Sequence, residues 1–214
     1  MLKSMMIYRN MTWDDAYNSG NIPWDTPYPD QQLLKLIEEY KIHPCNVLDV
    51  GCGRGLTSRE LAKRSFVVKG IDISPRAIEL AKSESKNLTN NLTFEVVDFM
   101  QPKLLGDTFD FVIDTACFQY NFNNNFVERV FNHLNQNGLW YTSIGSIEDK
   151  LDFSIKPEFK EEGSPELSLE PPAYSLNKIV NILNPYFIIK DIRHYRWGGD
   201  GFYFYSILMT KRFL

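Results

Sequence analysis

The stretch from Asn46 to Gly55 constrains the fold of this chain more than any other. It reads Asn-Val-Leu-Asp-Val-Gly-Cys-Gly-Arg-Gly, a short apolar run with one carboxylate, followed by glycines at alternate positions. Val47, Leu48 and Val50 predict a buried strand, and glycines let the backbone turn sharply and approach a ligand where a Cβ atom would collide. Helix-forming residues follow from Leu56 to Arg64. This order predicts an α/β fold with a ligand loop after its first strand.

Asp49 narrows the kind of ligand that this loop accepts. It lies two residues before Gly51, where it would repel the negative charge of a bound pyrophosphate. The Gly-x-Gly-x-Gly spacing also differs from the Gly-x-Gly-x-x-Gly that is typical of dinucleotide loops. S-adenosylmethionine carries a sulfonium and an ammonium group against one carboxylate, so an acidic loop favours it over NAD. Residues 48–55 resemble the first motif of class I S-adenosylmethionine-dependent methyltransferases. A glycine turn without a ligand is the alternative interpretation.

Carboxylates also follow the next predicted strands. Asp72 lies 21 residues beyond Gly51, the offset at which an acid accepts both ribose hydroxyls, although a lone aspartate there could instead cap a helix. In the family that the chain resembles, the acid after the third strand binds the adenine amino group with help from the next backbone group. Asp98 and Phe99 match those positions, and a loop aspartate without a ligand is the alternative. The resemblance implies these cofactor contacts: Trp24, Asp49, Gly51, Cys52, Gly53, Asp72, Ile73, Asp98, Phe99 and Asp114.

The N-terminal segment is rich in aromatic residues. Thr12 predicts the start of a short helix that Gly20 ends, with Trp13 and Tyr17 on one face. The pattern Trp-x-x-x-Tyr followed by Gly-x-x-Pro-Trp-Asp resembles the N-terminal lid of thiopurine and plant thiol or halide methyltransferases and their bacterial relatives. That resemblance covers Trp13 to about Leu139 and implies an arm that folds over the cofactor and walls the substrate pocket. Packing of the same aromatics as a structural arm is the alternative.

The rest of the chain predicts one doubly wound domain over residues 1–214, with a Rossmann-like, mostly parallel, seven-stranded sheet. Residues 1–41 would form the lid arm and its helix, and residues 146–174 a long loop near the active site. A helix is expected over 123–134, stopped by Asn137-Gly138, and a strand over 139–145. The β-rich runs 187–197 and 202–210 lie too close together for a parallel crossover, so they predict an antiparallel hairpin.

Composition excludes several classes of function. The net charge is -4 and no basic run follows the chain, which argues against nucleic acid as a partner. The three cysteines contain no Cys-x-x-Cys pair, so neither a disulfide framework nor a metal site is expected. No signal peptide or membrane-length apolar stretch is present. These features predict a cytoplasmic, monomeric enzyme.

The candidate acceptor wall follows the fourth strand. Many bacterial relatives have a histidine at the position of Gln119, so we expect Gln119 and Tyr120 to position the acceptor without taking its proton. His43, His133 and His194 are interpreted as surface or packing residues. No catalytic base is therefore assigned, because methyl transfer from a sulfonium needs one only for an acceptor that arrives protonated. The predicted substrate contacts are Trp13, Tyr17, Trp24, Phe118 and Tyr120.

These features predict S-adenosylmethionine-dependent methyl transfer to a small molecule, such as a thiol or another soft nucleophile. An NAD-dependent oxidoreductase is the rival enzyme class. This oxidoreductase class is disfavoured by Asp49, the glycine spacing and the terminal hairpin. A cofactor-binding regulatory protein without turnover is a third hypothesis, because methyltransferases have no obligatory catalytic residue whose loss the sequence would show.

Overall fold

The computed structural model describes residues 12–20, 22, 24–88, 90–101, 107–148, 172–197 and 202–213. They build one eight-stranded sheet with the order β3-β2-β1-β4-β5-β8-β7, and a short strand, β6, pairs with β5 beside this path. The strands are β1 (Asn46–Val50), β2 (Val67–Asp72), β3 (Leu92–Val96), β4 (Phe109–Thr115), β5 (Leu134–Ser146), β6 (Ala173–Tyr174), β7 (Phe187–Trp197) and β8 (Phe202–Lys211). Strands β1 to β6 pair in parallel, and β8 runs antiparallel to both β5 and β7.

The predicted fold class is confirmed, with one more strand than expected. β6 has only two residues, which is too short for a period-2 pattern, and it exists through its pairing with the end of β5. The predicted hairpin is present as β7 and β8. The loop predicted over residues 146–174 lies mostly outside the described residues.

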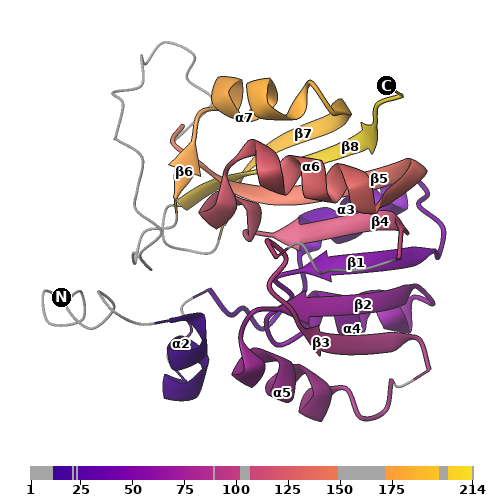
Figure 1. Cartoon of the computed structure of the whole chain (residues 1–214), viewed down its shortest axis with the longest axis vertical. Helices are drawn as coiled ribbons and strands as arrows, with labels where there is room; N and C mark the ends of the chain where they lie inside the picture. Colours follow the sequence, from indigo (N-terminus) through magenta and orange to yellow (C-terminus); the bar gives the residue numbers. More distant parts are fainter. Residues whose placement is uncertain are drawn as a thin grey trace, which may run out of the picture.

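Helices cover both faces of the sheet (Figure 1). They are α2 (Trp13–Ser19), α3 (Gln31–Glu39), α4 (Leu56–Lys63), α5 (Pro75–Glu84), α6 (Asn124–His133) and α7 (Leu176–Leu183), with a 3₁₀ helix, η1 (Phe118–Asn121), after β4. Side chains of Thr12, Ser74 and Ser175 cap α2, α5 and α7, as the sequence predicts. Helix α2 lies beside the edge where the parallel strands end and packs against α5.

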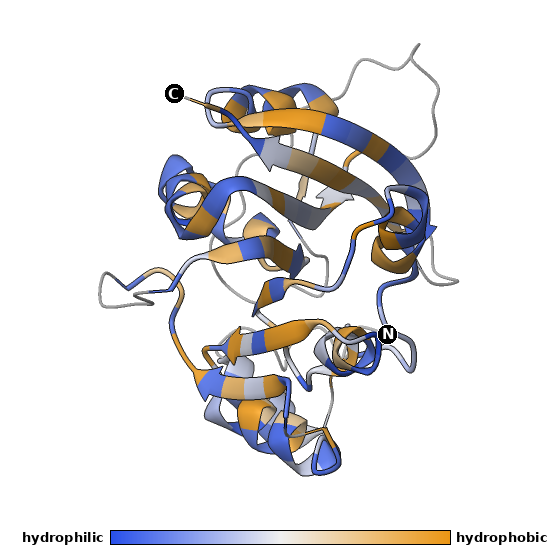
Figure 2. Ribbon diagram, turned by 90° about the vertical axis from the view of Figure 1, so that its right-hand side faces the viewer, coloured by the Kyte–Doolittle hydropathy of each residue, from blue (hydrophilic) through white to orange (hydrophobic). Residues whose placement is uncertain are grey.

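Two apolar cores hold the layers together. One core joins α6 and α7 to the sheet through side chains such as Phe126, Trp140 and Leu183. The other joins α3, α4 and α5 to the opposite face, with Leu33 and Leu61 among its members. The helices alternate between hydrophobic and hydrophilic residues, and the strands carry segments of both kinds (Figure 2). This alternation is the pattern of a helix that buries one side.

The prediction for residues 134–139 is wrong in one respect. Asn137-Gly138 does not separate a helix from a strand, because β5 begins at Leu134, directly after α6. Leu134 pairs with Phe109 and Leu139 pairs with Phe111, so residues 135–138 stand opposite Asp110 alone. The turn residues therefore form a bulge inside a long strand.

Candidate active site

A loop of left-handed glycines lies at the carboxyl edge of the sheet. Gly51, Gly53 and Gly55 have φ values of 68°, 53° and 72°, a region that favours glycine. The loop is held to β2, because the Cys52 amide donates to the Ile71 carbonyl at 2.9 Å. The thiol of Cys52 faces β2 and would lie 3.0 Å from a Cβ atom on Gly70. The Cys52 carbonyl accepts the Gly55 amide at 2.8 Å, so both backbone groups of Cys52 bond within the protein, and its predicted cofactor contact stays a prediction.

Asp72 ends β2 and ties the glycine loop to the next helix. Its carboxylate accepts the Gly53 amide at Oδ2 and the Ser74 amide at Oδ1, both at 2.9 Å. Burial raises its pKa, and these amide bonds oppose that effect. Each oxygen keeps a second lone pair for a ligand hydroxyl. The neighbouring Ile73 is 51% exposed, so it presents an apolar side chain beside this carboxylate.

Asp49 is the buried carboxylate of the site. Its side chain is 1% exposed, Ser58 donates to Oδ2, and Oδ1 is buried without a hydrogen-bond partner among the described residues. Burial raises the pKa of Asp49 to about 7. An unpartnered buried carboxylate oxygen is costly, and a cationic ligand group would satisfy it. The site therefore fits the sulfonium and ammonium groups of S-adenosylmethionine. Ser58 was not identified from the sequence, because nothing in its spacing marks it.

Asp49→Asn is expected to stabilise the ligand-free protein at pH 8. In the wild type, the folded state keeps the Asp49 proton up to a pH of about 7, whereas the unfolded state loses it near the ordinary value of 3.8. Wild-type stability should therefore fall as the pH rises from about 4 to about 7 and stay level above, and asparagine lacks this loss. Urea unfolding over this range should show a widening gap between the two proteins. Parallel curves would contradict the burial of the charge.

Asp98 and Phe99 follow β3 as predicted, with different orientations. The Asp98 side chain is half-buried and accepts the Met100 amide at 2.9 Å. The Phe99 ring packs in the core against Phe126, and the Arg129 guanidinium lies over it at 5.3 Å. Only the backbone of Phe99 remains for a ligand, which is the contact that the resemblance implies.

The carboxylate of Asp114 is occupied within the protein. It is fully buried, accepts the amides of Cys117 and Phe118 at 3.1 and 2.8 Å, and accepts Trp140 Nε1 at 3.1 Å. Burial raises its pKa to about 6. These bonds hold the turn in which Ala116 has a φ of 68°, a conformation that costs an L-residue about 1–2 kcal/mol. The structure thus gives Asp114 a role in shaping the wall, and its predicted cofactor contact stays a prediction.

The aromatic arm meets the wall that follows β4. Trp13 makes an edge contact with Tyr120 at 4.8 Å between ring centroids and another with Trp24 at 5.1 Å. Trp24 Nε1 donates to Tyr17 Oη at 3.3 Å. Tyr17 lies directly over the glycine loop, because a Cβ atom on Gly53 would stand 2.5 Å from its hydroxyl. Four of the five predicted substrate contacts are therefore together at this edge.

The predicted substrate contact of Phe118 is corrected by the structure. Its ring is fully buried in the core, stacked on Phe126 and in edge contact with Trp140, so it does not face a substrate. Gln119 is also buried, and its Oε1 accepts the Gly145 amide at 2.9 Å. This amide braces the wall against β5. Only Tyr120 of the predicted wall points toward the arm.

Two carboxylates of the arm, Asp14 and Asp25, hold it to the glycine-loop region. Asp14 accepts the Ser74 hydroxyl at 2.6 Å and the Arg76 amide at 2.8 Å, at the start of α5. Arg54 Nη1, within the glycine loop, lies 2.7 Å from Asp25 Oδ2. The sequence did not single out these pairs, because their partners lie 29 to 62 residues apart.

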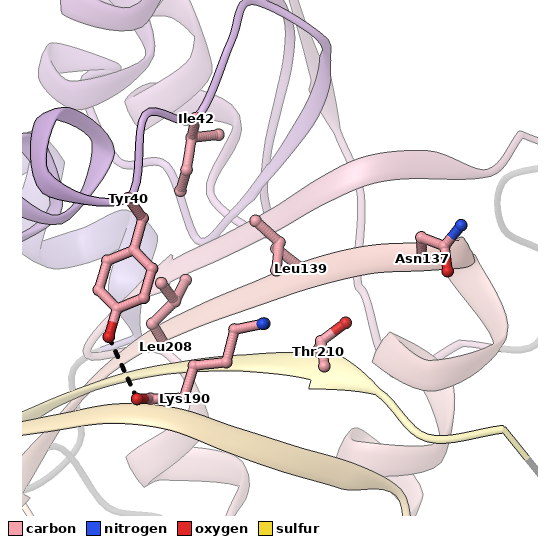
Figure 3. Close-up of a pocket in the computed structure, with 7 residues that line it drawn as sticks. All are labelled: Tyr40, Ile42, Asn137, Leu139, Lys190, Leu208 and Thr210. Carbon is pink, nitrogen blue, oxygen red and sulfur yellow. Dashed lines mark hydrogen bonds between the residues drawn. The ribbon is translucent and has the colours of Figure 1, made fainter.

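A separate groove of about 380 Å³ lies at the opposite, amino edge of the sheet (Figure 3). The Tyr40 hydroxyl closes one side through a bond of 3.2 Å to the Lys190 carbonyl. The other lining residues are Ile42, Asn137, Leu139, Leu208 and Thr210. None of the predicted site residues lines this groove, so it is distinct from the candidate site.

The described part of the chain contains no cluster of three or more histidine, cysteine or carboxylate side chains suited to a metal ion. None of its helices is long and apolar enough to cross a membrane.

The strand order, the antiparallel end and the acidic glycine loop define the class I methyltransferase fold. Residues 47–138 match the family model described as a methyltransferase domain. The 2-heptyl-1-hydroxyquinolin-4(1H)-one methyltransferase of Mycobacteroides abscessus is 40% identical over 98 residues, which are 45% of this chain and 42% of that protein. The chain thus spans less than half the length of this relative.

Solved structures share the fold over most of the chain. The 1,6-didemethyltoxoflavin-N1-methyltransferase of Burkholderia thailandensis, crystallised with S-adenosylhomocysteine, has a TM-score of 0.71 at 15% identity and covers 92% of this chain and 84% of its own. TehB of Haemophilus influenzae has a TM-score of 0.65 at 16% identity and covers 93% of this chain and 66% of its own. At these identities, the likeness concerns the fold.

Proposed function

We propose that this protein is an S-adenosylmethionine-dependent methyltransferase that acts on a small molecule. The observation that carries the proposal is the unpartnered Oδ1 of buried Asp49, beside a left-handed glycine loop that Asp72 holds at 2.9 Å. Asp49 would face the cationic methionine part, Asp72 the ribose hydroxyls, and Asp98 with the Phe99 backbone the adenine. When bound, S-adenosylmethionine supplies a methyl group on a sulfonium, and an in-line displacement leaves a neutral thioether.

In this proposal the protein acts mainly by positioning the methyl donor and the acceptor. Orientation of two reactants alone can be worth about 7–11 kcal/mol, so no Ser-His-Asp or metal constellation is required. The Asp114 turn places Tyr120 at the wall, and Trp13 closes over it at 4.8 Å. This aromatic enclosure excludes water from the attacking atom.

For the acceptor we propose a thiol or another soft nucleophile. The rings of Trp13, Trp24 and Tyr120 supply the apolar, polarisable surroundings that sulfur favours, and thiol or halide methyltransferases share the Trp-x-x-x-Tyr arm. Two similar proteins are named for heteroaromatic substrates, a hydroxyquinolone and a toxoflavin precursor, which supports a small, flat acceptor.

The test compares S-adenosylhomocysteine with NADH by isothermal titration. We expect micromolar binding of the former, as is common for enzyme ligands, and no heat with the latter. Preference for NADH would favour the oxidoreductase alternative. A screen of thiols and heteroaromatic acceptors by mass spectrometry then separates an enzyme from a regulatory protein, because only an enzyme yields methylated product.

The arm is proposed to act as the lid of this site. Asp14→Ala should then raise the dissociation constant for S-adenosylhomocysteine several-fold, because the Ser74 and Arg76 donors lose their acceptor. Acrylamide quenching of Trp13 and Trp24 should increase, while the unfolding midpoint stays nearly constant. Asn18→Ala, which removes only a bond to Asp14 within α2, is the matched control. A large fall in the unfolding midpoint would favour the packing role.

A further inference from the structure

Four side chains that are not among the predicted site residues form a hydrogen-bonded cluster at the carboxyl edge. His194 Nε2 lies 3.1 Å from Ser146 Oγ, and Ser146 Oγ lies 2.8 Å from Glu148 Oε2. The Tyr205 hydroxyl donates to the same carboxylate oxygen at 2.8 Å. From the sequence alone, His194 was interpreted as a surface or packing residue. We call these residues the His194 cluster.

The hydrogen bonds of Ser146 indicate which ring nitrogen of His194 carries a proton. Ser146 has a single hydroxyl proton, which it donates to Glu148 Oε2 at 2.8 Å. Ser146 Oγ must then accept from the imidazole, which places a proton on Nε2 of His194. No described residue bonds Nδ1. His194 therefore keeps a lone pair that can receive a proton.

The cluster borders the proposed acceptor wall. Ser146 ends β5 directly after Gly145, whose amide donates to Gln119 Oε1 at 2.9 Å. On the other side, β6 pairs with Ser146, and the Tyr174 hydroxyl donates to the Gln119 carbonyl at 3.0 Å. Gln119 precedes Tyr120 in η1, so one buried residue connects the wall to the strand end that carries the cluster.

Aromatic and polar side chains surround the imidazole of His194. Two tyrosines of β8 lie beside His194. The ring of Tyr203 stacks on the imidazole with 5.2 Å between ring centroids, and the ring centroid of Tyr205 lies 4.7 Å from that of His194. Ser146 and Glu148 face it from the end of β5, and Arg196 lies two residues along its own strand.

We propose that His194 accepts the proton of the methyl acceptor, with Ser146 and Glu148 as positioning residues. This inference rests on the proposed methyl transfer. The proton of an acceptor S–H group passes to His194 Nδ1, and the S–H electrons remain on sulfur as a thiolate. With the cofactor bound, this thiolate would form the new bond to the methyl carbon while the methyl–sulfonium bond breaks and its electron pair stays on the cofactor sulfur. When the thioether product has formed, His194 is an imidazolium, and it returns its proton to water. With this base, thiols that are neutral at pH 7 become substrates.

The first experiment compares two classes of thiol at pH 7 in His194→Gln. For alkyl thiols with pKa values of about 8 to 10, we expect a fall in kcat of about 100-fold, the range of general base catalysis. Thiophenols that are already ionised should lose less than about 3-fold by the same reasoning. His43→Gln, an exposed histidine before β1, is the matched control and should change neither class. Equal losses for both classes would overturn the proposal.

The second experiment needs no turnover. Nitrogen-15 spectra of the protein with bound S-adenosylhomocysteine should show His194 as the Nε2–H tautomer, and Ser146→Ala should mix the tautomers. Adding thiophenol should shift the Nδ1 signal. An Nδ1–H tautomer, or a Nδ1 signal that thiophenol leaves unchanged, would overturn the proposal.

The two proposals fail in different ways. Absence of S-adenosylhomocysteine binding by isothermal titration would overturn the proposed function itself. Normal binding without methylation of any thiol in the panel would overturn the role of His194 and leave the cofactor proposal standing. Unchanged affinity for S-adenosylhomocysteine in His194→Gln establishes that this variant is folded.

Discussion

Asp72→Ala should lower the affinity for S-adenosylhomocysteine by about 10- to 150-fold, since hydrogen bonds to charged groups are worth about 1.5–3 kcal/mol. Two effects add. The variant loses the proposed acceptor of the ribose hydroxyls, and it also loses the oxygens that receive the Gly53 and Ser74 amides. The glycine loop therefore loses its brace at the same time as its ligand contact.

Isothermal titration measures this loss, with two comparisons. Asp72→Asn retains one oxygen and should fall between alanine and the wild type. Glu79→Ala removes an exposed carboxylate on α5 that pairs only with Arg76, and it should bind normally. Normal affinity in a folded Asp72→Ala protein would remove Asp72 from the proposed site.

Gly55→Ala should lower the free energy of unfolding by about 2–5 kcal/mol. The backbone term arises because Gly55 has a φ of 72°, where an L-residue loses about 1–2 kcal/mol. The packing term arises because the new Cβ atom would stand 2.4 Å from Phe94 Cζ and 2.6 Å from Cε1. Overpacking of a core typically costs about 1–3 kcal/mol.

A double mutant separates the two terms. Phe94→Leu removes the ring atoms that the new methyl group would meet, so Gly55→Ala should cost less in that background than in the wild type. Gly20→Ala provides the backbone term alone, because Gly20 has the same φ of 72° and no described residue places an atom within 4 Å of its added Cβ atom. Urea unfolding measures all four variants. Strictly additive losses would show that the Phe94 ring moves aside freely.

The buried carboxylates explain how one edge can serve a cationic ligand. Within the described part of the chain, Asp49 carries an unpartnered oxygen and has a raised pKa, whereas Asp114 satisfies its oxygens with backbone amides and an indole. Each residue lies one position before the end of its strand, and Asp114 pairs with Val50 rather than with Asp49, so the two side chains face opposite sides of the sheet. Asp49 is therefore left for the proposed ligand, whereas Asp114 shapes the wall.

Features that depend on neighbours in the sequence could be predicted from the sequence alone. The glycine loop follows from glycines at alternate residues, which tolerate the positive φ values found there. The caps at Thr12, Ser74 and Ser175 follow from side chains that accept the amide three residues away. The terminal hairpin follows from its short connection. In each case the decisive interaction is local, so the residue pattern contains the information.

Tertiary structure alone decided the features that join distant segments. Phe118 lies in a single 3₁₀ turn with no periodicity, so only the packing of α6 against β5 turned its ring into the core. The bulge at residues 135–138 arises from pairing with β4. His194 meets Ser146, 48 residues away, because β8 lies between β5 and β7 and sets their register. Such contacts depend on which strands become neighbours, and no local pattern of residues determines that choice.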